Sequence, residues 1–144
     1  MNTIETNYYL SNCKQFKGTF PRDMLPKTLS RPGCVIINTD TAKEPGTHWV
    51  CVYLDKEGTA HYFDSFGLCP EFKEIREFLN RISTKWESNT ICFQSIYSAT
   101  CGMYCVYYLT CRCKGGDMDD FRSLFNQVPG INDRLAEMIY KLQK

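Results

Sequence analysis

The sequence predicts a small α+β domain in which a mostly antiparallel sheet is packed with helices. The chain has 144 residues, of which 43% are hydrophobic and 14% aromatic, so it can bury one substantial core and is too apolar for a disordered chain. Short apolar runs bounded by turn residues indicate strands, and apolar stripes at helical spacing indicate helices. Since the sequence contains no linker, repeat or low-complexity tract, residues 1–144 are expected to form a single domain.

Three segments make up the first part of the predicted fold. Residues 3–12 are expected to form a short helix with Ile4 and Tyr8 facing inward. The turn-rich residues 16–32 are expected to form an extended loop over the surface. Residues 34–38 are apolar and rich in branched side chains, which is typical of a buried strand.

A hairpin is predicted next. Residues 48–54 and 60–64 are expected to form antiparallel strands, joined by the turn at residues 55–58. A helix should follow, with Pro70 in its first turn. Its inward stripe consists of Phe72, Ile75, Leu79 and Ile82. The alternation over residues 89–94 predicts another strand.

Three helices are predicted in the C-terminal part. The central helix should run over residues 102–113, where glycines then stop it. Asp117 and Asn132 are expected to cap the two helices that follow. Their inward-facing residues are expected to be Phe121, Leu124, Phe125 and Val128 in one helix, and Leu135, Met138, Ile139 and Leu142 in the other.

Charge and hydropathy exclude several classes of protein. The 17 basic and 16 acidic residues give a net charge of +1, which provides no overall attraction to nucleic acid and leaves a local basic patch open. No apolar run reaches the ~20 residues of a membrane span, so no membrane association is expected. The N-terminus is polar and lacks a basic region, so we expect no signal peptide and no secretion.

Nine cysteines are present, which is an odd number. A secreted disulfide scaffold would be shorter and would pair its cysteines, so reduced thiols in a cytosolic or nuclear compartment are expected. Zinc-finger spacing is missing, because no pair of cysteines is separated by two residues and only two histidines occur. Cys111 and Cys113 are the remaining zinc candidates, and no metal site is expected. The cysteines are Cys13, Cys34, Cys51, Cys69, Cys92, Cys101, Cys105, Cys111 and Cys113.

The sequence around Cys101 is polar before this residue and apolar from Met103 onward, as in a loop that runs into a buried helix. A thiol at a helix N-terminus faces unpaired backbone N–H groups and the positive end of the helix dipole, which favour the nucleophilic thiolate. Gly102 has no side chain and would let a substrate backbone approach closely. Cys101 is therefore a candidate nucleophile, although this stretch alone fits a buried structural cysteine equally well.

Two further candidates lie on the predicted hairpin. His48 opens one strand and Asp64 ends its neighbour, so both should lie at the same edge of the sheet. There, His48 could act as a general base and Asp64 could orient its ring. The alternatives are a structural histidine and a turn-forming aspartate. His61, which is the other histidine, lies mid-strand and is expected to be structural.

Gln94 ends the predicted strand that leads to Cys101, seven residues later. Its amide and the backbone N–H of Cys101 could donate to a developing oxyanion. A solvent-facing strand-end glutamine is the alternative for this residue alone. The four residues in this order, as base, acid, amide donor and nucleophile, indicate a catalytic site more specifically than any one of them does.

This ordered set resembles the adenain-type cysteine proteases of adenoviruses, in the wider group that includes SUMO-specific proteases. The matching blocks are FKGTF (16–20), CVIINT (34–39), GTHW (46–49), YFDSFG (62–67) and ATCGMYC (99–105), so the resemblance covers roughly residues 8–115. It implies an adenain-type, papain-like fold with Cys101 as nucleophile and His48 as base. By this resemblance, Asp64 stands at the position where adenovirus enzymes carry Glu and SUMO proteases carry Asp.

The resemblance also implies a substrate and partners. It implies a thiol endopeptidase with Gln94 and Cys101 in the oxyanion hole, and with Trp49 and Gly102 beside a Gly-rich protein or peptide substrate. The expected role is the maturation of viral capsid or core precursors in the host nucleus or cytoplasm and in the virion. No cofactor is expected for the chemistry itself. A capsid-derived peptide and DNA activate adenovirus enzymes, but Cys92 lies too close to Gln94 for its role as the peptide-linking cysteine to be transferred.

Two other hypotheses remain open. A peptidase or isopeptidase for a ubiquitin-like modifier would use the same residues, because such modifiers also end in Gly-Gly. A non-catalytic binding module stabilised by zinc would need none of them. The presence of His48, Asp64, Gln94 and Cys101 together favours an enzyme.

Overall fold

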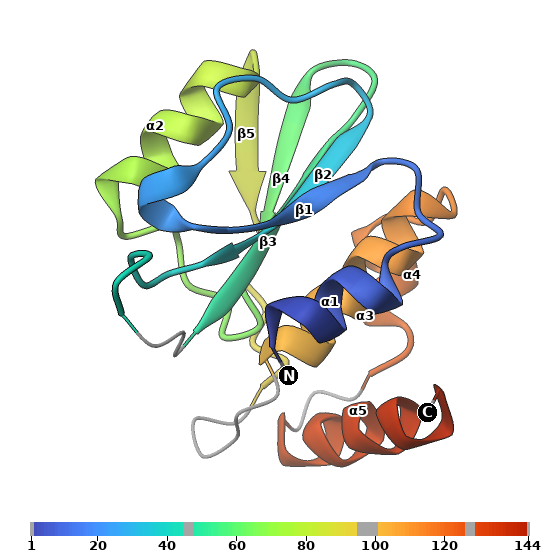
Figure 1. Ribbon diagram of the computed structural model, residues 1–144. Helices are drawn as coiled ribbons and strands as arrows, with labels where there is room; N and C mark the ends of the chain where they lie inside the picture. Colours follow the sequence, from blue (N-terminus) through green and yellow to red (C-terminus); the bar gives the residue numbers. More distant parts are fainter. Residues whose placement is uncertain (1, 45–47, 95–100, 126–128, 144) are drawn as a thin grey trace.

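A five-stranded mixed sheet runs through the molecule, as the computed structural model shows for residues 2–44, 48–94, 101–125 and 129–143 (Figure 1). Its strands lie in chain order: β1 (Phe16–Pro21), β2 (Gly33–Asn38), β3 (Trp49–Leu54), β4 (Thr59–Phe63) and β5 (Lys85–Ser88). The pairs β2–β3 and β3–β4 are antiparallel, whereas the outer pairs β1–β2 and β4–β5 are parallel. The predicted α+β class is confirmed, with a sheet that is more mixed than expected.

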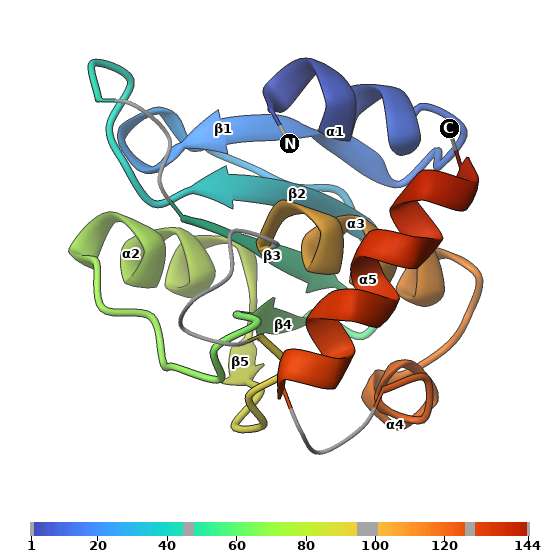
Figure 2. The ribbon, with the colours of Figure 1, turned by 90° about the horizontal axis from the view of Figure 1, so that it is seen from below.

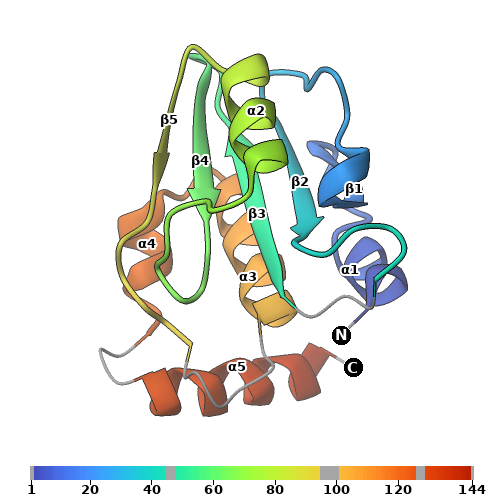
Figure 3. The same ribbon diagram turned by 90° about the vertical axis from the view of Figure 1, so that its left-hand side faces the viewer.

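Each face of the sheet is covered by a helix, as Figure 3 shows, with α2 (Lys73–Ile82) on one face and α3 (Cys101–Cys113) on the other. Strand alternation explains this division. In β2, Val35 and Ile37 pack toward α2, whereas Cys34 and Ile36 pack toward α3. The central strands are buried on both faces, and all six residues of β3 are buried.

The remaining helices pack around α3. These are α1 (Thr3–Tyr9), α4 (Met118–Arg122) and α5 (Pro129–Gln143), and a 3₁₀ turn, η1 (Arg22–Met24), follows β1. Helix α5 crosses the end of the molecule at which α3 begins (Figures 1 and 2). The hydroxyl of Tyr107 in α3 donates to the carbonyl of Ala136 in α5 at 2.9 Å. Among the described helices, we find none with the length and apolar character that crossing a bilayer requires.

The N-terminal predictions need two corrections. Helix α1 ends at Tyr9, and its Ile4 and Tyr8 are 81% and 72% exposed rather than inward-facing. Residue Thr6 is buried instead, because its hydroxyl bonds to the Thr3 carbonyl and to the Thr19 hydroxyl. Residues 16–21 form edge strand β1 rather than a surface loop. Their turn-like composition is tolerated because an edge strand needs a partner on one side only.

The middle of the chain also differs from the prediction. Helix α2 begins at Lys73, three residues after Pro70, and its buried stripe includes Phe78. Residues 89–94 form no strand. The strand lies just upstream as β5, where exposed and half-buried residues alternate along the sheet edge. The polar residue Asn89 interrupts the pattern, because its side chain bonds to backbone groups of a neighbouring segment.

In the C-terminal part, the cap at Asp117 is confirmed: its carboxylate accepts from the N–H of Asp120, and Asp120 completes the capping box. Asn132 does not cap α5, which begins at Pro129. Two residues predicted to face inward, Leu124 and Met138, are 55% and 59% exposed. Val128, and the side chain of Leu142, lie outside the described part of the structure.

The cysteines give a further correction. The sequence predicts reduced thiols throughout, yet Cys13 and Cys113 form a disulfide. The other seven cysteines are free: Cys34, Cys51, Cys69, Cys92, Cys101, Cys105 and Cys111. Sequence reasoning could not find the pair, because 100 residues separate its members.

We predict that Phe63→Ala lowers the free energy of unfolding by about 3–5 kcal/mol, because it empties a fully buried aromatic site. The ring of Phe63 stacks on Tyr108 with centroids 4.4 Å apart and meets Phe121 edge-on at 5.3 Å. Chemical denaturation measures the change. Leu124→Ala, at an exposed site, is the control and should shift the value by less than about 1 kcal/mol. Equal losses in both variants would contradict the assignment of the core.

Candidate active site

The hairpin brings His48 and Asp64 together. His48 directly precedes β3 and Asp64 directly follows β4, and the antiparallel pairing places these two ends side by side. The Nε2 atom of His48 lies 3.0 Å from Oδ1 of Asp64. Asp64 is only 4% exposed, so solvent screens this pair weakly. The loop before His48, at residues 45–47, lies outside the described residues.

Cys101 completes the group as the first residue of α3. The His48 ring hydrogen-bonds to the Cys101 side chain as well as to Asp64. Burial disfavours the charged ring, but these two hydrogen bonds and the charges of both partners outweigh it and raise the pKa of His48 to about 10. At neutral pH the imidazole is therefore a cation whose hydrogen-bond partners are the side chains of Asp64 and Cys101. A histidine beside a cysteine, oriented by an acid, is the arrangement that activates a nucleophilic thiol.

Asp64 is held in place by a residue that sequence reasoning missed. The buried carboxamide of Asn89 accepts from the backbone N–H of Asp64 at 2.9 Å and donates to its carbonyl at 2.7 Å. A second hydrogen bond to the carboxylate comes from the backbone N–H of Phe66 at 2.9 Å. No sequence signal marks Asn89, because its role depends on a contact across 25 residues.

His48 is held in a similar way. Its ring stacks on Phe66, with centroids 4.9 Å apart and an interplanar angle of 30°. Its carbonyl accepts from both the backbone N–H and the hydroxyl of Thr39, at 2.9 and 3.0 Å. Thr39 directly follows β2, so the end of β2 holds the backbone of His48 while Phe66 packs against its ring.

Gln94 is buried beside these residues. The hydroxyl of Ser65 donates a hydrogen bond to its Oε1, and the backbone N–H of Gln94 donates to the Ser65 carbonyl at 3.0 Å. The hydrogen bond from the Ser65 hydroxyl orients the amide, because Oε1 is its acceptor end and Nε2 its donor end. Residues 95–100, which join Gln94 to Cys101, lie outside the described residues.

The other predicted site residues are buried. Trp49 is 6% exposed and packs in the core, and its carbonyl accepts from the Cys105 thiol at 3.4 Å. Gly102 is buried in the first turn of α3. His61 lies apart from the site, as expected, and pairs with Asp55 at 3.0 Å and with Glu87 at 3.1 Å.

We predict that Ser65→Ala lowers kcat about 10-fold with little change in KM, because the Gln94 amide loses the donor that orients it. The buried oxygen left without this donor should also cost about 1–3 kcal/mol of stability. Ser83→Ala is the matched control, since that hydroxyl donates to the Leu79 carbonyl at the end of α2. Steady-state kinetics and denaturation of both variants check the prediction. A fall in kcat as large for Ser83→Ala as for Ser65→Ala would contradict it.

Comparison with known proteins places this geometry in a family. The family model described as adenovirus endoprotease matches residues 15–142, which is most of the chain and includes His48, Asp64, Gln94 and Cys101. The chain belongs to the adenovirus endoprotease family. The sequence-based resemblance is thereby confirmed.

Individual viral proteases are similar to parts of the chain. The cysteine protease S273R of African swine fever virus is 29% identical over 132 residues, covering 78% of this chain and 48% of its own length. The protease of human adenovirus A serotype 12 is 32% identical over 111 residues, covering 67% of this chain and 50% of its own length. The chain thus spans about half the length of these relatives.

Solved structures support the fold assignment. The crystal structure of the African swine fever virus pS273R protease has a TM-score of 0.52 at 21% identity, covering 73% of this chain and 44% of that chain. The central domain of Lpg1148 from Legionella pneumophila also has a TM-score of 0.52, at 14% identity, covering 89% of this chain and 85% of that chain. At these identities, the likeness extends to the fold alone.

Proposed function

We propose that this protein is a thiol endopeptidase in which Cys101 is the nucleophile. The observation that carries the proposal is the position of the His48 ring, which hydrogen-bonds to both Asp64 and Cys101. Membership of the adenovirus endoprotease family supports the same assignment.

The reaction follows from the positions of these groups. The Cys101 sulfur attacks the carbonyl carbon of the scissile bond, and the charge that develops on oxygen accepts from the Gln94 amide and the Cys101 N–H. His48 gives its proton to the amine as the C–N bond breaks, leaving an acyl-thioester. Water, deprotonated by His48, then attacks the thioester and releases the acid and the thiol. Asp64 holds the ring in place and stabilises its charged form throughout.

The substrate proposal is a protein or peptide cut at a Gly-rich site, as in the maturation of viral capsid or core precursors. It rests on the family resemblance, and two adenovirus relatives carry the name protease. We place the enzyme in a reducing compartment, namely the host nucleus or cytoplasm and the virion. The seven free cysteines support this placement, whereas the Cys13–Cys113 disulfide is the one feature that opposes it. The proposed chemistry uses no cofactor. An activating peptide or DNA would raise the rate of peptide cleavage.

The test is a cleavage profile of the purified chain on a peptide panel with and without Gly-Gly. The panel is repeated with candidate activator peptides and with duplex DNA. Cleavage restricted to Gly-containing peptides supports the proposal. Efficient release of a ubiquitin-like modifier from its precursor, without cleavage of the peptide panel, would replace it with the modifier-peptidase alternative. No cleavage of any substrate under any of these conditions would overturn it.

A further inference from the structure

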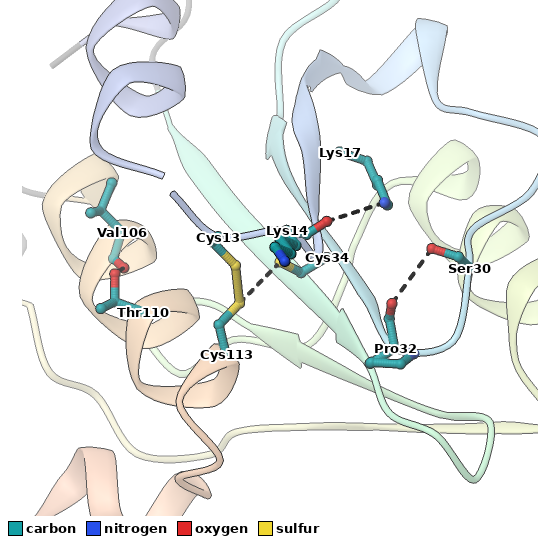
Figure 4. The surroundings of a disulfide bond; sticks show 9 residues. All are labelled: Cys13, Lys14, Lys17, Ser30, Pro32, Cys34, Val106, Thr110 and Cys113. Atoms are coloured by element: carbon teal, nitrogen blue, oxygen red, sulfur yellow. Dashed lines mark hydrogen bonds between the residues drawn. A yellow bond between two sulfur atoms is a disulfide. The ribbon is translucent and has the colours of Figure 1, made fainter. Parts of the chain in front are cut away.

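Three cysteines gather at the end of α3 opposite Cys101, as Figure 4 shows. Cys13 follows α1, Cys34 lies in β2, and Cys113 is the last residue of α3. Their sulfur atoms all lie within 4.8 Å of one another, and those of Cys34 and Cys113 are 3.8 Å apart. At a helical rise of about 1.5 Å per residue, this cluster lies about 18 Å along the helix from Cys101. It therefore takes no part in the peptidase chemistry.

We propose that Cys13, Cys34 and Cys113 bind a zinc ion when the Cys13–Cys113 disulfide is reduced. Zinc binds thiolate sulfur at about 2.3 Å, so two sulfurs of one tetrahedral site are about 3.8 Å apart. Cys34 and Cys113 already have this separation. The Cys13 sulfur also lies within 4.8 Å of the Cys34 sulfur, and reduction of the disulfide frees it to separate from the Cys113 sulfur to a similar distance. This site departs from the sequence-based expectation of no metal, because its ligands are 21 and 79 residues apart.

The surroundings suit an anionic metal–thiolate group. Three thiolates and one Zn²⁺ carry a net charge of −1, and basic side chains lie close by. Lys17 acts on Cys34 electrostatically, and Lys14 and Lys114 line the cavity of about 520 Å³ that also contains Cys13 and Cys113. This cavity gives a fourth ligand access from solvent.

Gln15 adds a second observation. Its side-chain Oε1 is buried and has no hydrogen-bond partner among the described residues. Its backbone carbonyl accepts from the Cys34 N–H at 2.8 Å, and the residue is one of those that line the same cavity. A buried oxygen without a partner is costly. A zinc ion, or a water bound to it, would supply the missing interaction.

The chemistry balances with a thiol reductant. Two electrons and two protons from a dithiol convert the disulfide into two thiols, and the reductant becomes a disulfide. Zinc then displaces up to three protons from the three thiols.

The experiment measures metal content by mass spectrometry in the full chain, purified with zinc and a dithiol reductant. We expect about one zinc ion per chain in the reduced protein, and less than about a tenth of this after oxidation with oxidised glutathione. Cys34→Ser should lose the metal. Cys111→Ser is the matched control on the same helix, since that sulfur points to the Asp117 carbonyl at 3.9 Å, and it should keep the metal.

Two more measurements locate the ion at this cluster. Cys101→Ala must also keep the zinc, because Cys101 beside His48 is the other place where the ion could bind. A cobalt titration of the reduced wild-type chain should show thiolate-to-metal charge-transfer absorption, a readout that needs no variant to fold. Zinc lost in Cys101→Ala but kept in Cys34→Ser would overturn the proposal. A reduced wild-type chain that binds neither metal would overturn it too.

Discussion

Cys101→Ala is expected to lower kcat/KM for peptide cleavage by at least about 10³-fold, because no other described sulfur lies beside the His48 ring in a position to attack. The fold should survive, since alanine fits the space of a cysteine that is 7% exposed at the start of α3. The measurement is kcat/KM on the best peptide of the panel, together with a thermal melt of each protein.

Cys111→Ser serves as the control for this loss, because Cys111 lies on the same helix and away from the hairpin. We expect its kcat/KM to match the wild type within about 2-fold. A thiol-reactive substrate analogue should label the wild type and Cys111→Ser but not Cys101→Ala. Residual cleavage by Cys101→Ala at the wild-type rate would refute the assignment of the nucleophile.

Asp64→Asn should lower kcat/KM about 10²-fold near neutral pH and move the alkaline limb of its pH profile to lower pH. The pKa of His48 is about 10, against an ordinary value of 6.5, partly because the Asp64 carboxylate stabilises the charged ring. Asparagine keeps the shape and the acceptor oxygen but removes the charge. The midpoint of the alkaline limb should therefore move to lower pH by at least about one unit.

Asp55→Asn is the matched control, because it makes the same change in the other histidine–aspartate pair, 3.0 Å from His61. The pH profile of this variant should coincide with that of the wild type. An alkaline limb that stays in place in Asp64→Asn would mean that the carboxylate does not hold the proton on His48.

The proton on the His48 ring also makes the stability of the fold depend on pH. A raised pKa means that the folded chain holds this proton more tightly than the unfolded chain does. The contribution of His48 to the free energy of unfolding is therefore fully present below about pH 6.5 and is lost as the pH rises through about 10. In Asp64→Asn this contribution should disappear at lower pH than in the wild type.

The sequence alone determined the parts of this protein that depend on local pattern. Alternation and turn residues placed His48 and Asp64 at neighbouring strand ends, and the change from polar to apolar residues placed Cys101 at the start of a helix. Such signals are readable because strand and helix periodicity act over a few residues.

Only the tertiary structure decided how these groups are held and what else lies nearby. The bonds of Asn89 to Asp64 and of Ser65 to Gln94 span 25 and 29 residues. Cys34 and Cys113, which are 79 residues apart, meet only after the sheet and α3 have packed. Residues this far apart come together through the packing of whole elements, and no local pattern in one chain encodes that contact.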